Sequence, residues 1–92
     1  MPTLHMEVET CRTAQQSIQQ AAEQLEALIT NVNNTLQGLH SGAWVGNSAD
    51  QFFSESDPWC SSVKGKSEEL TNLAMRLSSE ITEWENMAAK LG

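Results

Sequence analysis

The side chains in this 92-residue chain that could carry chemistry are two histidines, two cysteines and twelve carboxylates. His5 and His40 are far apart, and neither has a partner at the spacing of a metal-binding motif. Cys11 and Cys60 are too few for a disulfide framework and too widely separated for a zinc site, so we expect both to be reduced. Because Gly-rich phosphate loops, serine elbows and HExxH motifs are also lacking, the sequence predicts no enzyme, no metal and no cofactor.

Charge and apolar content argue against two further classes of partner. The chain carries 12 acidic and 5 basic residues, a net charge of −7, so it offers no basic patch to nucleic acid or anionic lipid. Its longest uncharged stretches are interrupted by Asn, Gln, Thr and Gly and fall short of the roughly 20 apolar residues of a membrane span. Glu7 and Glu9 stand where a secretory signal would carry basic residues. We expect neither stable membrane insertion nor a cleaved signal peptide.

A seven-residue repeat predicts that two long helices carry these side chains. One column of mostly apolar residues begins at Leu4 and continues in steps of seven to Leu39. Columns with the same spacing run through the second half of the chain. The repeat therefore predicts one domain over residues 1–92, with a helix over about 4–41, a turn over about 42–47 and a helix over about 48–91.

Local signals mark the ends of these helices and one irregularity. Gly42 is well placed to take the left-handed conformation that closes a helix. Ser48 and Gln51 have the spacing of a capping box, which predicts that the second helix starts at about Ser48. Pro58 removes one backbone donor, so we expect either a kink nearby or, with Asp57 as an N-cap, two separate helices. The kink is favoured because the apolar columns continue through Pro58.

Two long helices joined by a short loop can only fold back on each other, so the predicted fold is an all-α antiparallel hairpin. About three positions in seven are apolar, which is a wider stripe than one seam can bury, and pairing into a dimeric four-helix bundle would cover the remainder. Phe52 and Trp59 are expected, with Phe53, in the core near the turn. The full set of expected packing or dimer-interface residues is Leu25, Leu28, Ile29, Val32, Phe52, Trp59, Leu70 and Leu77.

The expected turn contains Trp44-Val45-Gly46, a Trp-X-Gly motif near the middle of the chain. Phe52 and Trp59 follow the motif at the start of the second helix. With the two flanking amphipathic helices, this pattern resembles the WXG family of small type VII secretion substrates, the early-secreted-antigen-like proteins. The resemblance covers the whole chain. It implies a hairpin that forms a homodimer or a heterodimer with another WXG-type helical hairpin and has no enzymatic activity.

The resemblance also implies a route of export. Family members leave the cell through a type VII machine driven by a membrane ATPase, without a cleaved signal, which implies a secreted protein with a cytoplasmic pool before export. Trp44 and Gly46 carry over as the turn and export motif. The family's C-terminal export element is a Tyr followed four residues later by an acidic residue, and this chain has Trp84 and Ala88 at about the corresponding places.

This degenerate element leaves the mode of export open. The chain is expected either to be exported itself or to act as a carrier for a type VII system through dimerisation. The alternative is an intracellular, chaperone-like targeting partner of a larger WXG-type or related toxin or effector.

Overall fold

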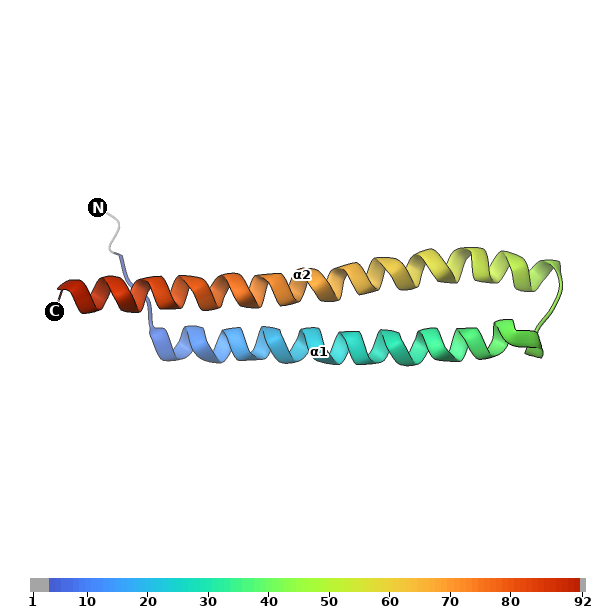
Figure 1. Ribbon diagram of the computed structural model, residues 1–92, viewed down its shortest axis with the longest axis horizontal. Helices are drawn as coiled ribbons and strands as arrows, with labels where there is room; N and C mark the ends of the chain where they lie inside the picture. The colour runs from blue at the N-terminus through green and yellow to red at the C-terminus, as the bar shows by residue number, and fades with distance from the viewer. Residues whose placement is uncertain (1–3, 92) are drawn as a thin grey trace.

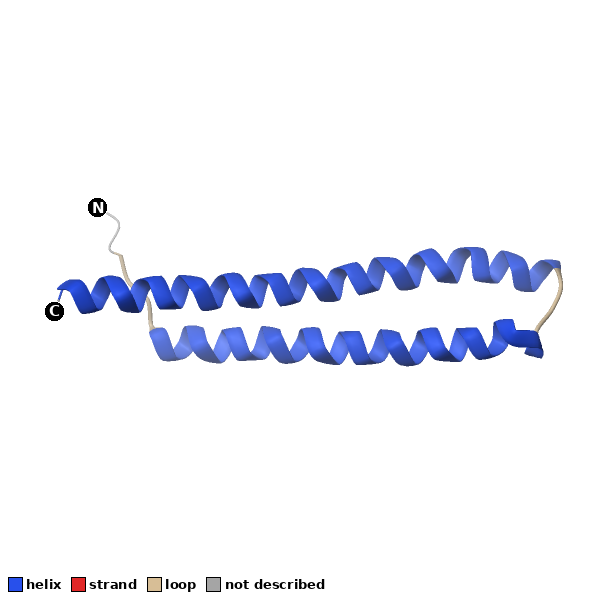
Figure 2. Cartoon of the chain, viewed as in Figure 1, coloured by secondary structure: helices blue, strands red, loops and turns tan. Residues whose placement is uncertain are grey.

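The computed structural model describes residues 4–91 and contains two long helices, α1 (Val8–Gly38) and α2 (Asn47–Leu91). A wide turn of the π-helical type, η1 (Leu39–Ala43), follows α1. The two helices lie side by side in opposite directions and form a rod of 69 by 23 by 15 Å (Figure 1). Within the described residues all regular structure is helical (Figure 2). The predicted all-α antiparallel hairpin is confirmed.

One seam, to which each helix contributes every seventh residue, holds the hairpin together. The buried members of this column are Ala22 and Ile29 on α1, and Phe53, Cys60, Ser67, Ala74 and Ile81 on α2. A seven-residue step keeps these side chains on one side of each helix along the whole contact. A neighbouring column is only half-buried: Cys11, Ile18 and Leu25 on α1, and Val63, Leu70, Leu77 and Trp84 on α2. The seam is therefore closed on one side and open on the other.

Helix α1 begins four residues later than predicted. Glu7 is the extended residue before the helix, and Leu4 is 78% exposed although it continues the apolar column. The ion pair between Arg12 and Glu85 places the first turns of α1 beside the last turns of α2. Residues 4–7 are not helical. The expected start at about residue 4 is therefore wrong.

The chain reverses direction through two glycines with positive φ. Gly42 has φ +126° inside η1, where the amide of Trp44 donates a hydrogen bond to the carbonyl of Leu39 at 3.1 Å. Gly46 has φ +133°, and its carbonyl accepts a hydrogen bond from the amide of Asp50 at 3.0 Å. Residues with a Cβ rarely adopt such φ values, so both positions favour glycine. The left-handed closure expected at Gly42 is confirmed.

The capping box predicted at Ser48 does not form. Helix α2 starts at Asn47, so Ser48 already lies in its first turn. Among residues 4–91, no hydrogen bond joins the side chain of Ser48 or Gln51 to the backbone of the other. Gly46 stands directly before the helix, and its carbonyl accepts the first helical hydrogen bond, from the amide of Asp50.

Pro58 lies inside α2, which continues through it as one helix (Figure 1). The alternative of two separate helices is therefore wrong, and the expected kink takes the form of a gentle bow. Pro58 lacks the N–H that would otherwise bond to the carbonyl of Ser54. Phe53 and Cys60 are both buried in the seam, one on each side of Pro58, and their packing holds the two segments against α1.

Candidate functional site

The Trp-X-Gly motif forms the tip of the hairpin. The ring of Trp44 lies 5.4 Å from the ring of Phe52 and 6.1 Å from that of Phe53, centroid to centroid. Phe53 is buried in the seam, so this cluster fixes the indole over the end of the helices. The indole nevertheless stays 39% exposed, and Val45 beside it is 81% exposed. The turn therefore presents a fixed aromatic ring to solvent.

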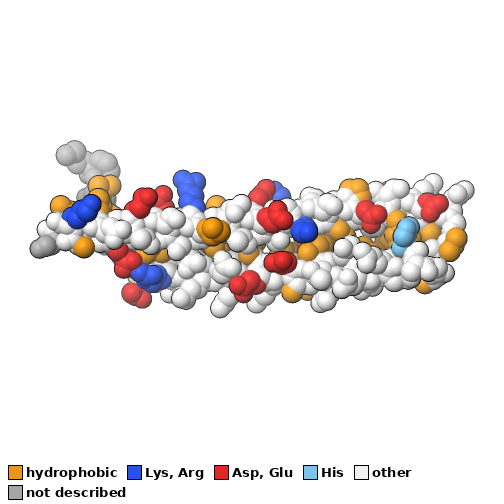
Figure 3. Space-filling model, in the orientation of Figure 1, with side chains coloured by type: hydrophobic (Ala, Val, Ile, Leu, Met, Phe, Trp, Pro, Cys, Tyr) orange, Lys and Arg blue, Asp and Glu red, His pale blue; other side chains and the backbone are white. Residues whose placement is uncertain are grey.

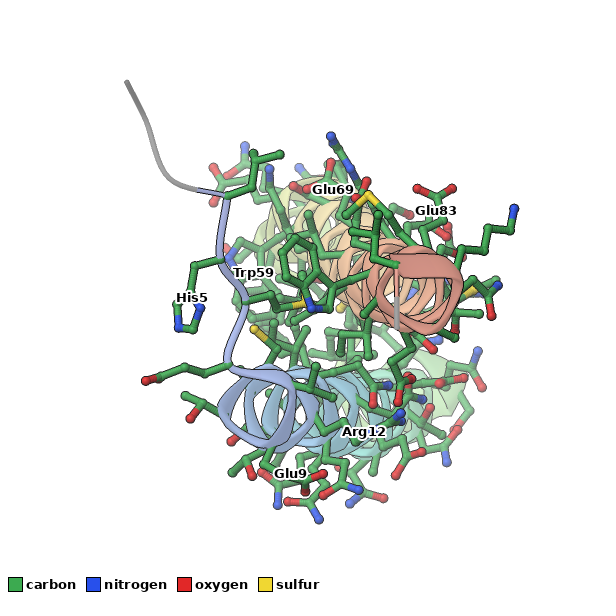
Figure 4. The ribbon with its side chains drawn as sticks, turned by 90° about the vertical axis from the view of Figure 1, so that its left-hand side faces the viewer. His5, Glu9, Arg12, Trp59, Glu69 and Glu83 are labelled. Atoms are coloured by element: carbon green, nitrogen blue, oxygen red, sulfur yellow. The ribbon has the colours of Figure 1, made fainter. Side chains whose placement is uncertain are left out.

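The two broad faces of the hairpin differ in chemistry. Residues that follow the buried column by four positions form the polar face, which includes Arg12, Gln19, Glu26, Asn33 and His40 on α1 and Asp57, Lys64, Thr71, Ser78 and Glu85 on α2. Figure 3 shows charged groups along this face, with apolar side chains visible in the gap between the helices. Arg12 lies on this side of the hairpin, whereas Trp59 lies on the opposite side (Figure 4).

The opposite side is the apolar face. Residues that precede the buried column by one position form it: Ala14, Ala21 and Leu28 on α1, and Phe52, Trp59, Lys66, Leu73, Glu80 and Met87 on α2. Leu28 is 61%, Trp59 56% and Leu73 53% exposed. The half-buried column of the seam is open toward this same face. Several large apolar side chains exposed on one face are typical of a surface that binds another protein.

The structure separates the predicted packing residues into two groups. Ile29 is buried, and Leu25, Leu70 and Leu77 are half-buried, so these four pack within the hairpin. Leu28, Val32, Phe52 and Trp59 remain exposed on or beside the apolar face.

The expectation that Phe52 and Trp59 belong to the core is wrong. Phe53 is the aromatic residue buried in the seam at this level, whereas Phe52 is 40% exposed. Leu73 and Met87 lie on the same face but were not among the expected interface residues. They share the seven-residue column of Phe52 and Trp59, and that spacing was the signal that could have found them.

The polar face contains a groove of about 570 Å³ near the turn. Buried Phe53 and Cys60 line it together with the exposed Asp57 and Lys64, and His40 packs edge-on against Phe53 with ring centroids 4.4 Å apart.

Across residues 4–91, no three His, Cys, Asp or Glu side chains are grouped so as to hold a metal ion. Cys11 and Cys60 are both free thiols.

The turn, the two helices and their lengths correspond to a known family. Residues 3–86 match the family described as proteins of 100 residues with WXG, or WXG100. The chain belongs to the WXG100 family. Proteins of this family are non-enzymatic secreted proteins that typically dimerise, and membership implies a type VII secretion substrate. Neither a curated protein nor a solved structure gives a significant match.

In this WXG100 protein, the two positions of the degenerate C-terminal element, Trp84 and Ala88, differ in solvent accessibility. Trp84 is half-buried in the seam, beside the first turns of α1, whereas Ala88 is exposed one turn further on. The indole of Trp84 therefore contributes to the hairpin core. Neither α1 nor α2, as far as the structure describes them, has a segment long and apolar enough to cross a bilayer.

Proposed function

We propose that this WXG100 protein is a non-enzymatic cargo or carrier of a type VII secretion system and works as a dimer. A second WXG-type hairpin, in a homodimer or a heterodimer, covers the apolar face and completes a four-helix bundle. The secretion ATPase or its associated machine binds the turn that contains Trp44 and Gly46. The protein is secreted without a cleaved signal and has a cytoplasmic pool before export.

The observation that carries this proposal is the exposed, fixed indole of Trp44. A tryptophan held in place by two phenylalanine rings loses little conformational freedom on binding, and such aromatic side chains dominate the affinity of many interfaces. The turn is also remote from the open end of the hairpin, where both helices have their other termini (Figure 1). Recognition at the tip therefore leaves the apolar face free for a partner.

The burial of Trp84 favours a second role, that of a passenger or targeting partner. A tryptophan packed in the seam presents only part of its ring, and exposed Ala88 supplies no negative charge. A complete C-terminal element on the partner would then direct the dimer to the machine. In the intracellular version of this role, the partner is a larger WXG-type or related toxin or effector.

The decisive experiment compares Trp44→Ala with Val45→Ala in a host whose type VII system is active. Both residues lie in the turn, but the Val45 side chain is almost free of contacts, so its removal controls for a general effect of turn mutations. We expect Trp44→Ala to reduce the secreted fraction at least tenfold, roughly the loss of one hot-spot side chain, and Val45→Ala to leave it unchanged. Circular dichroism and sedimentation velocity would show that both variants are still folded.

The proposal fails if folded Trp44→Ala protein is secreted at the normal level. Ala88→Glu separates the two roles, because this exposed position can accept a charge without disturbing the seam. Increased secretion of Ala88→Glu identifies a weak autonomous cargo. Unchanged secretion, together with loss of export when the partner gene is deleted, identifies a passenger.

A further inference from the structure

The α2 side of the apolar face is self-complementary about Leu73. In steps of seven, this column reads Trp59, Lys66, Leu73, Glu80 and Met87. Trp59 and Met87, at the two ends, each lie fourteen residues from Leu73. The oppositely charged Lys66 and Glu80 each lie seven residues from it. Each of these five side chains is at least partly exposed, as Trp59 at 56% and Leu73 at 53% illustrate. An antiparallel copy of the same helix would therefore place each apolar residue opposite an apolar residue and each charge opposite a charge of the other sign.

We infer that a second copy of this chain covers the apolar face, antiparallel to the first, with the two-fold axis at Leu73. Leu73 then meets Leu73 of the second copy, Lys66 meets Glu80, and Trp59 meets Met87. The inference rests on the dimerisation proposed above and adds the identity of the partner and the register. A two-fold interface is built from one surface patch used twice, so the patch must complement itself, and this column does.

A second column on the rim of α2 gives the same register independently. This second column consists of the residues three positions after each member of the first. They lie beside the first column on the helix surface and carry further charges. Glu69 and Arg76 lie four and three residues from Leu73, on opposite sides of it. Glu55 and Lys90 lie eighteen and seventeen residues from it, again on opposite sides. In the dimer each of these carboxylates therefore faces a basic side chain of the second copy.

Other antiparallel registers lose this complementarity. An axis midway between Lys66 and Leu73 brings Glu69 against its own copy, and an axis midway between Leu73 and Glu80 does the same for Arg76. An axis at Lys66 or at Glu80 brings identical charges face to face. Like charges placed opposite each other across a helix contact are destabilising, so the register at Leu73 is selected.

The size of the apolar face and the position of the axis are also suitable for a homodimer interface. The broad side of the rod measures 69 by 23 Å, which exceeds the ~800 Å² per partner of a standard protein interface. Leu73 lies 26 residues from Asn47, about 39 Å at 1.5 Å per residue, so the axis is remote from the turn that contains Trp44.

Cysteine cross-linking tests the axis directly. Leu73→Cys is placed in a background without native thiols, Cys11→Ser with Cys60→Ala, and oxidised mildly at a concentration where sedimentation shows the dimer. The two thiols that Leu73→Cys introduces at the axis are close enough for a disulfide, so most of the protein should become a covalent dimer. Met75→Cys is the matched control, because Met75 is 61% exposed on the same helix but points away from the apolar face.

A charge exchange tests the register by a different measurement. Lys66→Glu and Glu80→Lys should each weaken dimerisation about tenfold, because the two-fold axis converts two opposite-charge contacts into repulsive ones. The double variant should restore the affinity to within about threefold. Residues 66 and 80 of one chain are about 21 Å apart along α2, so restoration requires contact between chains. The Lys66–Glu69 ion pair within one chain, 3.2 Å, is lost in Lys66→Glu and in the double variant, so it cannot explain the restoration.

The outcomes separate this inference from the proposed function. A dimer in sedimentation whose Leu73→Cys variant does not cross-link, or cross-links no faster than Met75→Cys, overturns the register and leaves dimerisation intact. A double charge variant that dimerises as weakly as the single variants also overturns the register and leaves dimerisation intact. A protein that stays monomeric at tens of micromolar overturns the homodimer, and the Trp44→Ala secretion assay then decides the proposed function separately.

Discussion

Replacing Ile81 by Ala should destabilise the hairpin much more than replacing Met75 by Ala. Both residues are large and apolar and lie six positions apart on α2, but Ile81 is 2% exposed and Met75 61% exposed. Both substitutions introduce the residue with the best helix propensity, so propensity cannot cause a loss. The difference between the two variants therefore measures the burial of the seam.

The expected magnitude follows from the packing. Truncation of a fully buried Ile to Ala costs about 2–5 kcal/mol, whereas an exposed Met at a surface position changes stability by at most about 0.5 kcal/mol. A chain of 92 residues has a total stability of about 5–14 kcal/mol. Loss of Ile81 should therefore remove a large fraction of the stability and lower the melting temperature by about 10 °C or more.

Urea denaturation followed by far-ultraviolet circular dichroism would measure both variants at one fixed protein concentration, because the proposed dimerisation would make the midpoint depend on concentration. We expect a clear fall of the midpoint for Ile81→Ala and no change of slope. Equal midpoints for the two variants would refute the assignment of the seam. A larger loss for Met75→Ala would mean that the opposite side of α2 faces α1.

Two further predictions concern the backbone. Pro58→Ala should stabilise the protein by about 1–3 kcal/mol in the same urea assay, because α2 already runs through this position and the new N–H can bond to the carbonyl of Ser54. An unchanged or lower midpoint would show that Pro58 is required for the shape of α2. Gly42→Ala should cost about 1 kcal/mol because of its φ of +126°, whereas Gly65→Ala, in open space inside α2, should gain about 0.5–1 kcal/mol. The same sign for both glycine variants would contradict the structure of the turn.

The seven-residue repeat of the sequence predicted the hairpin because the side chains that pack in the seam recur with the same spacing. A side chain that recurs every seven residues stays on one side of a helix, and the buried residues from Phe53 to Ile81 follow that step without interruption. The positive φ at Gly42 was likewise predictable, because a chain that ends a long helix and reverses direction needs a residue without a Cβ.

The apolar repeat alone could not predict some features. Leu4 continues the apolar column, yet it lies before the helix and is 78% exposed. Phe52 and Phe53 are adjacent and chemically equivalent, and the rotation of α2 about its own axis decides which of them enters the seam. The difference between buried Ile29 and exposed Leu28 is of the same kind.

The distribution of side-chain size between seam and surface favours a coupling of folding to the proposed dimerisation. Three consecutive buried residues of α2, Cys60, Ser67 and Ala74, are small, and Ala22 contributes only a methyl group from α1. The larger Trp59 and Leu73 point outward. Burial stabilises by about 25 cal/mol per Å² of apolar surface, so these small residues contribute less to the seam than Ile29, Phe53 and Ile81 do, and the proposed dimer adds the burial of Trp59 and Leu73.

A chain of this size is already close to the limit at which one core suffices. The isolated hairpin should therefore be marginal, and in the proposed homodimer the second copy supplies a large part of the stability. In the proposed export role, the exposed side chain of Trp44 can be recognised without opening the seam of the hairpin.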